Sequence, residues 1–451
     1  MARSVDGPPS GAARWHGRQP DPRPKEQRLS DKDSVRRQTA GLGRAPRQDA
    51  YRRVLLTSVQ ARRAGRPDHR PFSLVESRHG PGTGVVRGEL LVRADAVDDE
   101  SLLEALAPYG FTSAPIEELS GRVLRLSDPD SELTVDQLTD VARFIRTTGH
   151  QASVNHITPL GPVMKGRGGP EPTSVTLSFP AAPTTGNAPV PIALIDTGVT
   201  AEQRTDGWLA GLVREDNVDP LDDLPAPNGF LDYGAGHGTF TAGIVQQMHP
   251  GAQVSMYRAV DSDGVGSEAD VACAMVRAVR EGARILSLSL GVNTVDDQPL
   301  LAIDVALDII AELDPEVLVF AAAGNDGTST PCWPAASKRV VSVGALAADL
   351  SPAPWSNHGF WVDCSAVGEG IVSTYVQGVE SPELDPYPDR FGSDAWAVWT
   401  GTSFATPQVA GAVAGIAEEA GCTPREALRR LWEDCRTVPD YGRAIPLLPG
   451  T

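Results

Sequence analysis

Cysteine is scarce in this sequence of 451 residues, which contains only five. No two cysteines stand in the close pairs typical of zinc sites, so we expect no structural zinc. An odd and sparse set fits reduced thiols better than a disulfide framework. Cys332 with Cys364, or Cys422 with Cys435, could pair only if the protein is exported.

Long apolar runs are also absent. None approaches the roughly 20 residues that a membrane-spanning helix needs, and residues 1–9 lack the apolar segment of a secretory signal. The longest early apolar cluster, residues 54–56, is far too short for either purpose. We therefore expect no membrane partner and a cytoplasmic location, with secretion as the alternative.

Aromatic residues make up only 6% of the sequence, and few of them lie near its N-terminus. Residues 1–85 are rich in Arg, Pro, Gly and Gln and are predicted to form a disordered arm. Residues 1–87 carry 19 Lys/Arg and 8 Asp/Glu, against 21 and 50 in the remainder, so a basic arm precedes an acidic body. Only Trp15, Tyr51 and Phe72 could stack on bases, so nucleic acid is not the expected partner.

Residues 86–161 are predicted to form a separate small unit. Its apolar spacing gives the order β-α-β-β-α-β of an α+β domain with ferredoxin-like topology. The expected strands are 88–94, 111–119, 122–126 and 151–157, and the expected helices are 98–109 and 134–148. Residues 162–188 are rich in Gly and Pro and are predicted to be a linker.

The remaining residues, 189–451, alternate buried strands with helices. This alternation favours an α/β fold with a doubly wound, mostly parallel sheet that has helices on both faces. In sheets of this kind, reactive groups gather at the carboxyl ends of the strands. Asp196, Ser289 and Asn325 all lie at predicted strand ends.

A turn that leads into a helix suggests a nucleophile. Ser403 follows Gly401 and precedes the small, apolar run 409–416, so it is expected at a helix start. There, unpaired backbone N–H groups and the helix dipole favour a developing anion. Pro407 is expected in the first turn, where its missing N–H costs little. Alone, the pattern also fits a buried helix capped by a serine.

Serine hydrolysis also needs a base and a carboxylate that orients the base. His237 lies between two glycines at a predicted helix start, and Asp196 ends a buried strand. Asn325, in an Ala-Gly-Asn-Asp-Gly segment, could donate a hydrogen bond to an oxyanion. Each motif alone also fits an ordinary turn or helix start, but their conjunction in the order Asp, His, Ser favours a catalytic site.

Residues 186–436 resemble the catalytic domain of the subtilisin-like serine proteases, the subtilases. The motifs that carry the resemblance are Ile195–Gly198, Gly236–Gly243, Ser287–Gly291, Ala322–Gly327 and Gly401–Pro407. The resemblance implies a serine endopeptidase with Ser403 as nucleophile, His237 as base and then acid, and Asp196 as its orienting carboxylate. It also implies an oxyanion hole formed by Asn325 and the Ser403 N–H, and substrate-binding segments that include Ser289, Leu290, Gly291, Ala323 and Gly324.

Two positions depart from the commonest pattern of the family, since Phe240 and Gln408 stand where further histidines are frequent. Neither is expected to carry a catalytic role. The resemblance also implies that the unit 86–161 is a prodomain that inhibits the protease until the chain is cut between about 158 and 188. No cofactor is expected; the acidic stretch 215–223 could bind calcium, but a solvated loop is the favoured interpretation.

Two other functions stay open. A protease-like scaffold could bind a peptide strand along Ser287–Gly291 without cutting it, although the intact Asp196, His237, Ser403 and Asn325 count against this. A regulated protease could instead process one dedicated partner. The sequence therefore predicts a peptide or protein substrate without naming one.

Overall fold

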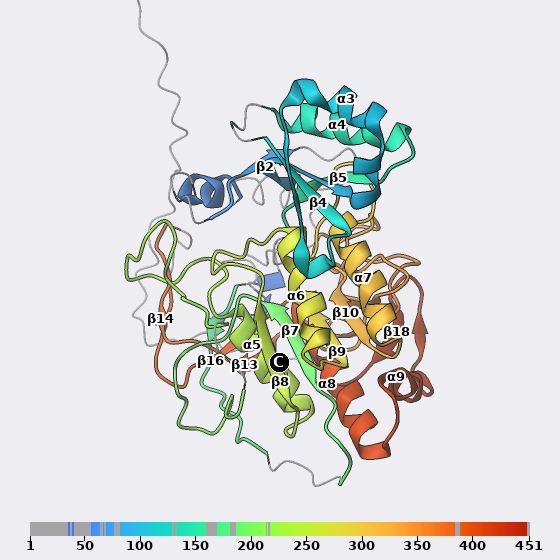
Figure 1. The fold of residues 1–451 in the computed structure, drawn as a ribbon. Coiled ribbons are helices and arrows are strands. Elements are labelled where there is room, and N and C mark those ends of the chain that lie inside the picture. Colours follow the sequence, from blue (N-terminus) through green and yellow to red (C-terminus); the bar gives the residue numbers. More distant parts are fainter. Residues whose placement is uncertain are drawn as a thin grey trace, which may run out of the picture.

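The computed structural model describes two units that contact each other, a small α+β unit and a larger α/β unit (Figure 1). The described residues are 35–36, 38–39, 56–63, 66, 69–75, 82–128, 130, 133–158, 169–180, 186–212, 214, 217–383 and 388–448. No disulfide joins the five cysteines, all of which lie in these ranges. None of the helices in them is both long and apolar enough to cross a membrane.

An eight-stranded sheet is the centre of the larger unit, with the order β17-β18-β12-β11-β10-β9-β7-β8. Its neighbours are parallel from β18 to β8, and only β17 runs antiparallel to its neighbour. The strands are β7 (Ile192–Asp196), β8 (Val254–Arg258), β9 (Ile285–Leu288), β10 (Leu318–Ala322), β11 (Val341–Leu346), β12 (Cys364–Val367), β17 (Thr437–Val438) and β18 (Gly442–Ile445). This is the mostly parallel sheet that the sequence predicts.

Helices cover both faces of this sheet. Along β7, Ile195 packs on one face with α6 (Glu268–Arg280) and α7 (Leu301–Leu313). Leu194 packs on the other face with α5, α8 and α9, which are His237–Met248, Thr402–Ala420 and Pro424–Trp432. Because successive side chains of a strand point to opposite faces, burial of both faces explains the continuous apolar runs in the sequence.

Two smaller sheets flank the main one. The first has the order β13-β16-β6 and the second pairs β14 with β15. Their strands are β6 (Glu171–Pro172), β13 (Ile371–Thr374), β14 (Gly378–Val379), β15 (Arg390–Phe391) and β16 (Trp396–Trp399). Strand β6 lies within residues 162–188, which were predicted to be a linker. The described part of that stretch is therefore not unstructured. Part of the stretch is held in place by Phe179, because the centroid of its ring lies 5.1 Å from that of Trp208.

The small unit contains an antiparallel sheet with the order β1-β2-β4-β3, in which β5 also pairs with β2. Without β1, the order β3-β4-β2-β5 is that of a ferredoxin-like domain. The elements are β1 (Phe72–Val75), β2 (Thr83–Arg93), β3 (Thr112–Pro115), β4 (Val123–Ser127), β5 (Ala152–His156), α3 (Glu100–Leu106) and α4 (Val135–Thr147), with short 3₁₀ helices at Ala94–Asp98, Ala107–Tyr109 and Glu117–Leu119.

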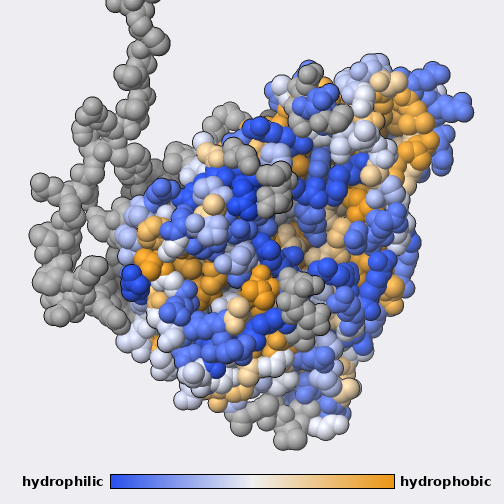
Figure 2. All heavy atoms as spheres, turned by 60° about the vertical axis from the view of Figure 1, so that its left-hand side comes forward, coloured by the Kyte–Doolittle hydropathy of each residue, from blue (hydrophilic) through white to orange (hydrophobic). Residues whose placement is uncertain are grey.

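The small unit sits on helices α6 and α7 of the larger unit. Its own helices α3 and α4 cover one face of its sheet. From the rest of the unit, Leu91, Leu119 and Val123 join the apolar cluster built by α6 and α7. Figure 2 shows hydrophobic residues at the surface in the upper part of the molecule, where the small unit lies. The large apolar side chains exposed in the small unit are Val97, Leu103, Tyr109 and Phe144.

The prediction of a disordered arm over residues 1–85 is wrong for the part that the structure describes. Residues 56–63 are helical, and the arm adds β1 to the small sheet. Val59 and Phe72 are buried against Val265 of the larger unit. Composition alone could not show this, because a few apolar side chains and one strand order the segment. The remaining residues of the predicted arm lie outside the described residues.

Candidate active site

Asp196 and His237 form a buried pair at the carboxyl end of the parallel sheet. Asp196 is the last residue of β7, and His237 is the first residue of α5. The imidazole Nδ1 lies 2.7 and 3.0 Å from the two carboxylate oxygens of Asp196 and donates to them. With its Nδ1 proton held in this way, the ring presents Nε2 as the nitrogen that can accept a proton.

The start of α8 brings Ser403 to the same place. Ser403 follows Thr402, the first residue of the helix, and the ring of Phe404 lies 5.5 Å from that of His237. In the described chain, the Ser403 hydroxyl donates to the Ser289 carbonyl at 3.2 Å, with no hydrogen bond to His237. A nucleophile and its base often reach hydrogen-bond distance only when substrate is bound, so the arrangement is compatible with such a pair.

Pro407 lies in the second turn of α8, not in the first turn as the sequence predicted. Proline has no N–H to donate to the carbonyl four residues back, which here belongs to Ser403. The Ser289 hydroxyl donates to that carbonyl instead, at 2.8 Å. Ser289 and Ser403 therefore exchange two hydrogen bonds, which join the segment after β9 to the start of α8.

The side-chain amide of Asn325 has a fixed orientation. Its Oδ1 accepts from both the N–H and the hydroxyl of Thr402, at 2.9 Å each. Because these two groups are donors, they identify the oxygen end of the amide, and Nδ2 is the end that can donate to a ligand. A small pocket beside Asn325 and Ser403 is also lined by Leu290, Gly291, Asn293, Ala322, Gly324, Asp326, Cys332 and Thr402.

Two glycines border this pocket at positions where no side chain fits. A Cβ at Gly291 would lie 2.7 Å from the sulfur of Cys332, and a Cβ at Gly324 would lie 2.4 Å from the amide nitrogen of Asn357. Gly324 also has a φ of +101°, which favours glycine. The N–H of Ala323 is already used, since it donates to the Val343 carbonyl at 2.9 Å.

The backbone of Ser289, Leu290 and Gly291 continues past the paired part of β9. Ser287 and Leu288 pair with β10 on one side and β7 on the other. Of the segment Ser287–Gly291, where a bound peptide strand was expected, Ser287 and Leu288 are already paired on both sides. The part that could bind a peptide strand therefore begins after Leu288. Strands on both sides leave β9 no room for an added strand along its own length.

Thr197 and Asp219, which are not among the site residues predicted from the sequence, connect the loop after β7 to the start of α5. Asp219 is 2% exposed, and its burial raises the pKa of the carboxyl to about 6. Thr197 is part of the motif Ile195–Gly198, but its hydroxyl carried no separate signal. Asp219 lies in the acidic stretch 215–223, for which the sequence favours a solvated loop.

That acidic stretch does not fit calcium in its described residues, 217–223. Asp219 is occupied as above, and the Asp222 carboxylate accepts from backbone N–H groups of its own loop. Asp223 forms an ion pair with Arg66 at 3.4 Å. Across the described ranges, no three His, Cys, Asp or Glu side chains are grouped to hold a metal ion.

Phe240 and Gln408, which replace frequent histidines of the family, are buried. The ring of Phe240 lies 4.6 Å from that of Phe404 and 5.5 Å from that of Trp399. The Gln408 amide donates to the carbonyls of Val367 and Phe404, at 2.7 and 2.8 Å. Both residues therefore stabilise the surroundings of the site.

Comparison with known proteins decides the family. Residues 188–436, more than half of the chain, match the sequence profile described as Peptidase_S8, Subtilase family. The chain belongs to the subtilase family. The α/β fold of a subtilase and the serine protease class, both expected from the motifs, are thereby confirmed.

This subtilase resembles proteases over much of its length. It is 30% identical over 356 residues to a thermophilic serine proteinase from Bacillus sp. (strain AK1). The aligned region covers 74% of this chain and 79% of that protein. It is 32% identical over 241 residues to thermitase from Thermoactinomyces vulgaris, which covers 51% and 75% of the two chains. The protein is a serine endopeptidase that acts on peptides or proteins, and subtilases generally need no cofactor.

The expected cytoplasmic location is contradicted by a third relative. The subtilase is 30% identical over 266 residues to minor extracellular protease Epr from Bacillus subtilis (strain 168), which covers 52% of this chain and 37% of that protein. That relative is extracellular by its name. The residues at the N-terminus therefore do not place this subtilase in the cytoplasm.

Proposed function

We propose that Ser403, His237 and Asp196 form the catalytic triad of this endopeptidase. Ser403 Oγ attacks the carbonyl carbon of the scissile peptide bond, and its proton passes to Nε2 of His237. Asp196 holds the ring through Nδ1 and stabilises the imidazolium. The observation that carries the proposal is the buried Asp196–His237 pair, at 2.7 and 3.0 Å, beside the helix start that carries Ser403.

The remaining steps use the same groups. His237 gives the proton from Nε2 to the leaving amine, the C–N bond breaks, and the acyl group stays on Ser403 as an ester. A water molecule then loses a proton to Nε2 and attacks the ester carbonyl. The second product leaves as a carboxylic acid, and Ser403 Oγ recovers its proton from Nε2.

Two donors would stabilise the negative oxygen that forms in both steps. One is Nδ2 of Asn325, whose orientation is set by the two bonds from Thr402 to Oδ1. The other is the Ser403 N–H, because the first N–H groups of a helix have no partner within the helix. Both donors are held before the reaction begins, which favours charge that develops in the transition state.

The substrate backbone would lie between Ser289–Gly291 and Gly266 as an added strand. A segment of this chain supports that position. After β5, the N–H of Thr158 donates to the Gly266 carbonyl at 2.8 Å, and Ile157 forms an antiparallel bridge with Ser267. The residue before the scissile bond would enter the pocket beside Asn325, where Asp326 favours a basic side chain.

The same segment supports latency of the full-length protein. β5 belongs to the small unit and leads directly to Thr158, so a segment of that unit contacts Gly266, which we propose as one side of the substrate position. A bound segment competes with substrate. We infer that the unit 86–161 inhibits the protease until the chain is cut between about 158 and 188.

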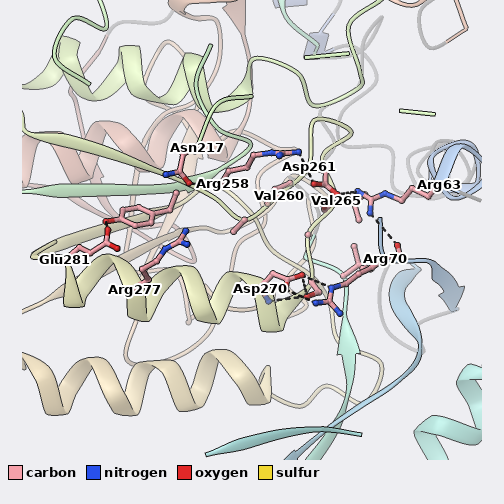
Figure 3. Close-up of a pocket in the computed structure, with 15 residues that line it drawn as sticks. Arg63, Arg70, Asn217, Arg258, Val260, Asp261, Val265, Asp270, Arg277 and Glu281 are labelled. Carbon is pink, nitrogen blue, oxygen red and sulfur yellow. Dashed lines mark hydrogen bonds and ion pairs between the residues drawn. The ribbon is translucent and has the colours of Figure 1, made fainter. Parts of the chain in front are cut away.

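The described arm strengthens this contact through two charged side chains, of which Arg63 is buried and Arg70 is partly exposed. Arg63 is 3% exposed and donates to both carboxylate oxygens of Asp263 at 2.6 Å and to Asp261 at 2.8 Å. Arg70 donates to Asp270 at 3.0 and 3.1 Å. Figure 3 shows Arg63 and Arg70 pointing toward acidic residues of the larger unit. The arm therefore adds to the attachment of the small unit.

A self-cleavage experiment tests the proposal. Purified wild-type chain should yield a shorter species on gels, whereas Ser403→Ala should stay at full length. Trace wild type added to Ser403→Ala should cut it if the cleavage is also intermolecular. A wild type that cleaves peptide substrates but stays uncut would show that the small unit is a retained regulatory domain.

A further inference from the structure

A ring of hydrogen bonds surrounds the backbone of His237, and the proposed mechanism does not use the side chains that form it. The N–H of Gly236 donates to Asp219 Oδ2 at 2.9 Å, and the N–H of Gly238 donates to Thr197 Oγ1 at 3.1 Å. The Thr197 hydroxyl donates to Asp219 Oδ2 at 3.1 Å. The residues on both sides of His237 therefore donate hydrogen bonds to two linked side chains, those of Asp219 and Thr197.

The same pair is fixed to the loop that carries Asp196. Thr197 is the next residue in the chain, and its N–H donates to Asp196 Oδ1 at 2.7 Å. Asp219 is held through its second oxygen, which accepts from the Leu221 N–H at 3.0 Å. All the hydrogen-bonding groups in this network are buried or belong to the backbone, so water competes little for them.

Close packing of three backbone segments leaves this junction little freedom. A Cβ at Gly198 would lie 2.7 Å from the Asp219 nitrogen, and a Cβ at Gly238 would lie 2.0 Å from the Gly198 carbonyl oxygen. Val199 and Val218 form a parallel bridge beside it. The loop after β7, the segment around Asp219 and the start of α5 are therefore stacked backbone to backbone.

We propose that Thr197 and Asp219 are positioning residues that set how the Asp196 carboxylate meets the ring of His237. The proposal rests on the triad assigned above. The hydrogen bonds support this role. The Thr197 N–H donates to Asp196, and the Thr197 hydroxyl donates to Asp219. Both side chains also accept hydrogen bonds from the N–H groups of the residues that flank His237. A displacement of about 1 Å between catalytic groups can cost about 10²-fold in rate, so such a ring affects turnover directly.

The charge of Asp219 acts on its neighbours from several elements. Burial raises the pKa of Asp219 to about 6, and the nearby charge of Arg258 of β8 acts in the opposite direction. Tyr375, after β13, has its pKa raised by burial and by the charge of Asp219. The Asp196–His237 pair of β7 and α5 is connected to Asp219 through Thr197, whose N–H donates to Asp196. At neutral pH the carboxylate is ionised and can accept from all three donors.

Two variants break the ring with little change of shape. Asp219→Asn offers one acceptor oxygen to three donors, and its NH₂ group would face a donor. Thr197→Val removes the hydroxyl, whereas Thr197→Ser keeps it and serves as the conservative rescue. Asp363→Asn is the matched control, because Asp363 is a carboxylate with a raised pKa that accepts a backbone N–H, from Ser342 at 2.9 Å, away from this site.

The variants are compared by labelling with a fluorophosphonate and by turnover of a peptide substrate. The final extent of labelling gives the fraction of active enzyme, and the rate reports activation of Ser403. We expect Asp219→Asn and Thr197→Val to lower both kcat and the labelling rate about 10- to 100-fold, with KM within about twofold. Thr197→Ser and Asp363→Asn should stay near wild type.

The outcomes separate this inference from the proposed function. If wild type is not labelled at Ser403, the triad itself is wrong. If wild type is labelled, and fully labelled Asp219→Asn and Thr197→Val react at the wild-type rate, the positioning role is refuted. A loss confined to the labelled fraction or to the thermal unfolding midpoint would also refute it, because that is the result of a purely structural role.

Discussion

At the scale of single residues, the site depends on which atom of each polar side chain is already engaged. Asn325 uses its Oδ1 for Thr402, which leaves Nδ2 as the donor end. His237 uses Nδ1 for Asp196, which leaves Nε2 as the base. The chemistry therefore follows from hydrogen bonds that orient each group before substrate arrives.

Replacement of Asn325 by alanine tests the oxyanion donor. The variant should lose about 10²- to 10³-fold in kcat with little change in KM, a magnitude known from subtilisin, a relative. Asn187→Ala is the control, because the Asn187 amide donates to the Glu418 carbonyl near the other end of α8. Steady-state kinetics on one peptide substrate decides the matter, and equal losses in both variants would argue against the assignment.

The buried carboxyl of Asp232 should make the unfolding free energy depend on pH. Burial raises the pKa of its carboxyl from 3.8 to about 6. The folded state therefore binds more protons than the unfolded chain between these values, and stability falls as pH rises through this range. Relative to Asp232→Asn, wild type should lose about 2 kcal/mol of unfolding free energy from pH ~4 to pH ~7. Urea denaturation at several pH values measures this, and a constant difference would contradict it.

At the scale of elements, the helix α8 carries the nucleophile and depends on a partner outside itself. Pro407 cannot donate to the Ser403 carbonyl, and the Ser289 hydroxyl takes that place. The end of one strand thus completes the hydrogen bonding of a helix that is far away in sequence. The first turns of α8 are held to the segment after β9 by the two hydrogen bonds between Ser289 and Ser403.

A double-mutant experiment tests that arrangement. Ser289→Ala should destabilise the fold by about 1–3 kcal/mol, because it leaves a buried carbonyl without a donor. Combined with Pro407→Ala, the same change should cost less, since the new N–H at position 407 can donate to Ser403. Denaturant unfolding of the four proteins in the cycle gives the coupling. Strict additivity of the two changes would contradict the explanation.

At the scale of the whole molecule, the two units meet through an apolar contact with ion pairs at its edges. These ion pairs differ in burial. Arg63 and Asp263 are almost fully buried, with side chains 3% and 4% exposed. Arg122 and Glu312 are exposed, at 39% and 59%. Loss of a buried partner leaves an uncompensated charge, whereas an exposed pair contributes little.

Arginine replacements at the two pairs should therefore differ. Arg63→Ala should weaken attachment of the arm by about 3–5 kcal/mol, whereas Arg122→Ala, which removes an exposed and solvent-screened pair, should leave the attachment nearly unchanged. Hydrogen exchange of residues 69–75 reports the attachment, and it should accelerate only in Arg63→Ala. Similar exchange in both variants would mean that the arm is not held by Arg63.

The core of the fold and the three candidate catalytic residues could be predicted from the sequence for a physical reason. Buried parallel strands give continuous apolar runs, and Asp196, His237 and Ser403 stand at element ends within two residues of a glycine. Contacts between distant segments left no local pattern. Gln38 illustrates this, because its amide bonds with Thr400, 362 residues away. The ordered parts of the arm and the ring around His237 were missed for the same reason.

The central claim is that His237, held by Asp196, activates Ser403. Fluorophosphonate labelling with mass spectrometry of the adduct tests it most directly. The account predicts one adduct, on Ser403 of the wild type, none in Ser403→Ala, and a strongly slowed reaction in His237→Ala. A wild type that folds but stays unlabelled, or that is labelled at the same rate without His237, would contradict it.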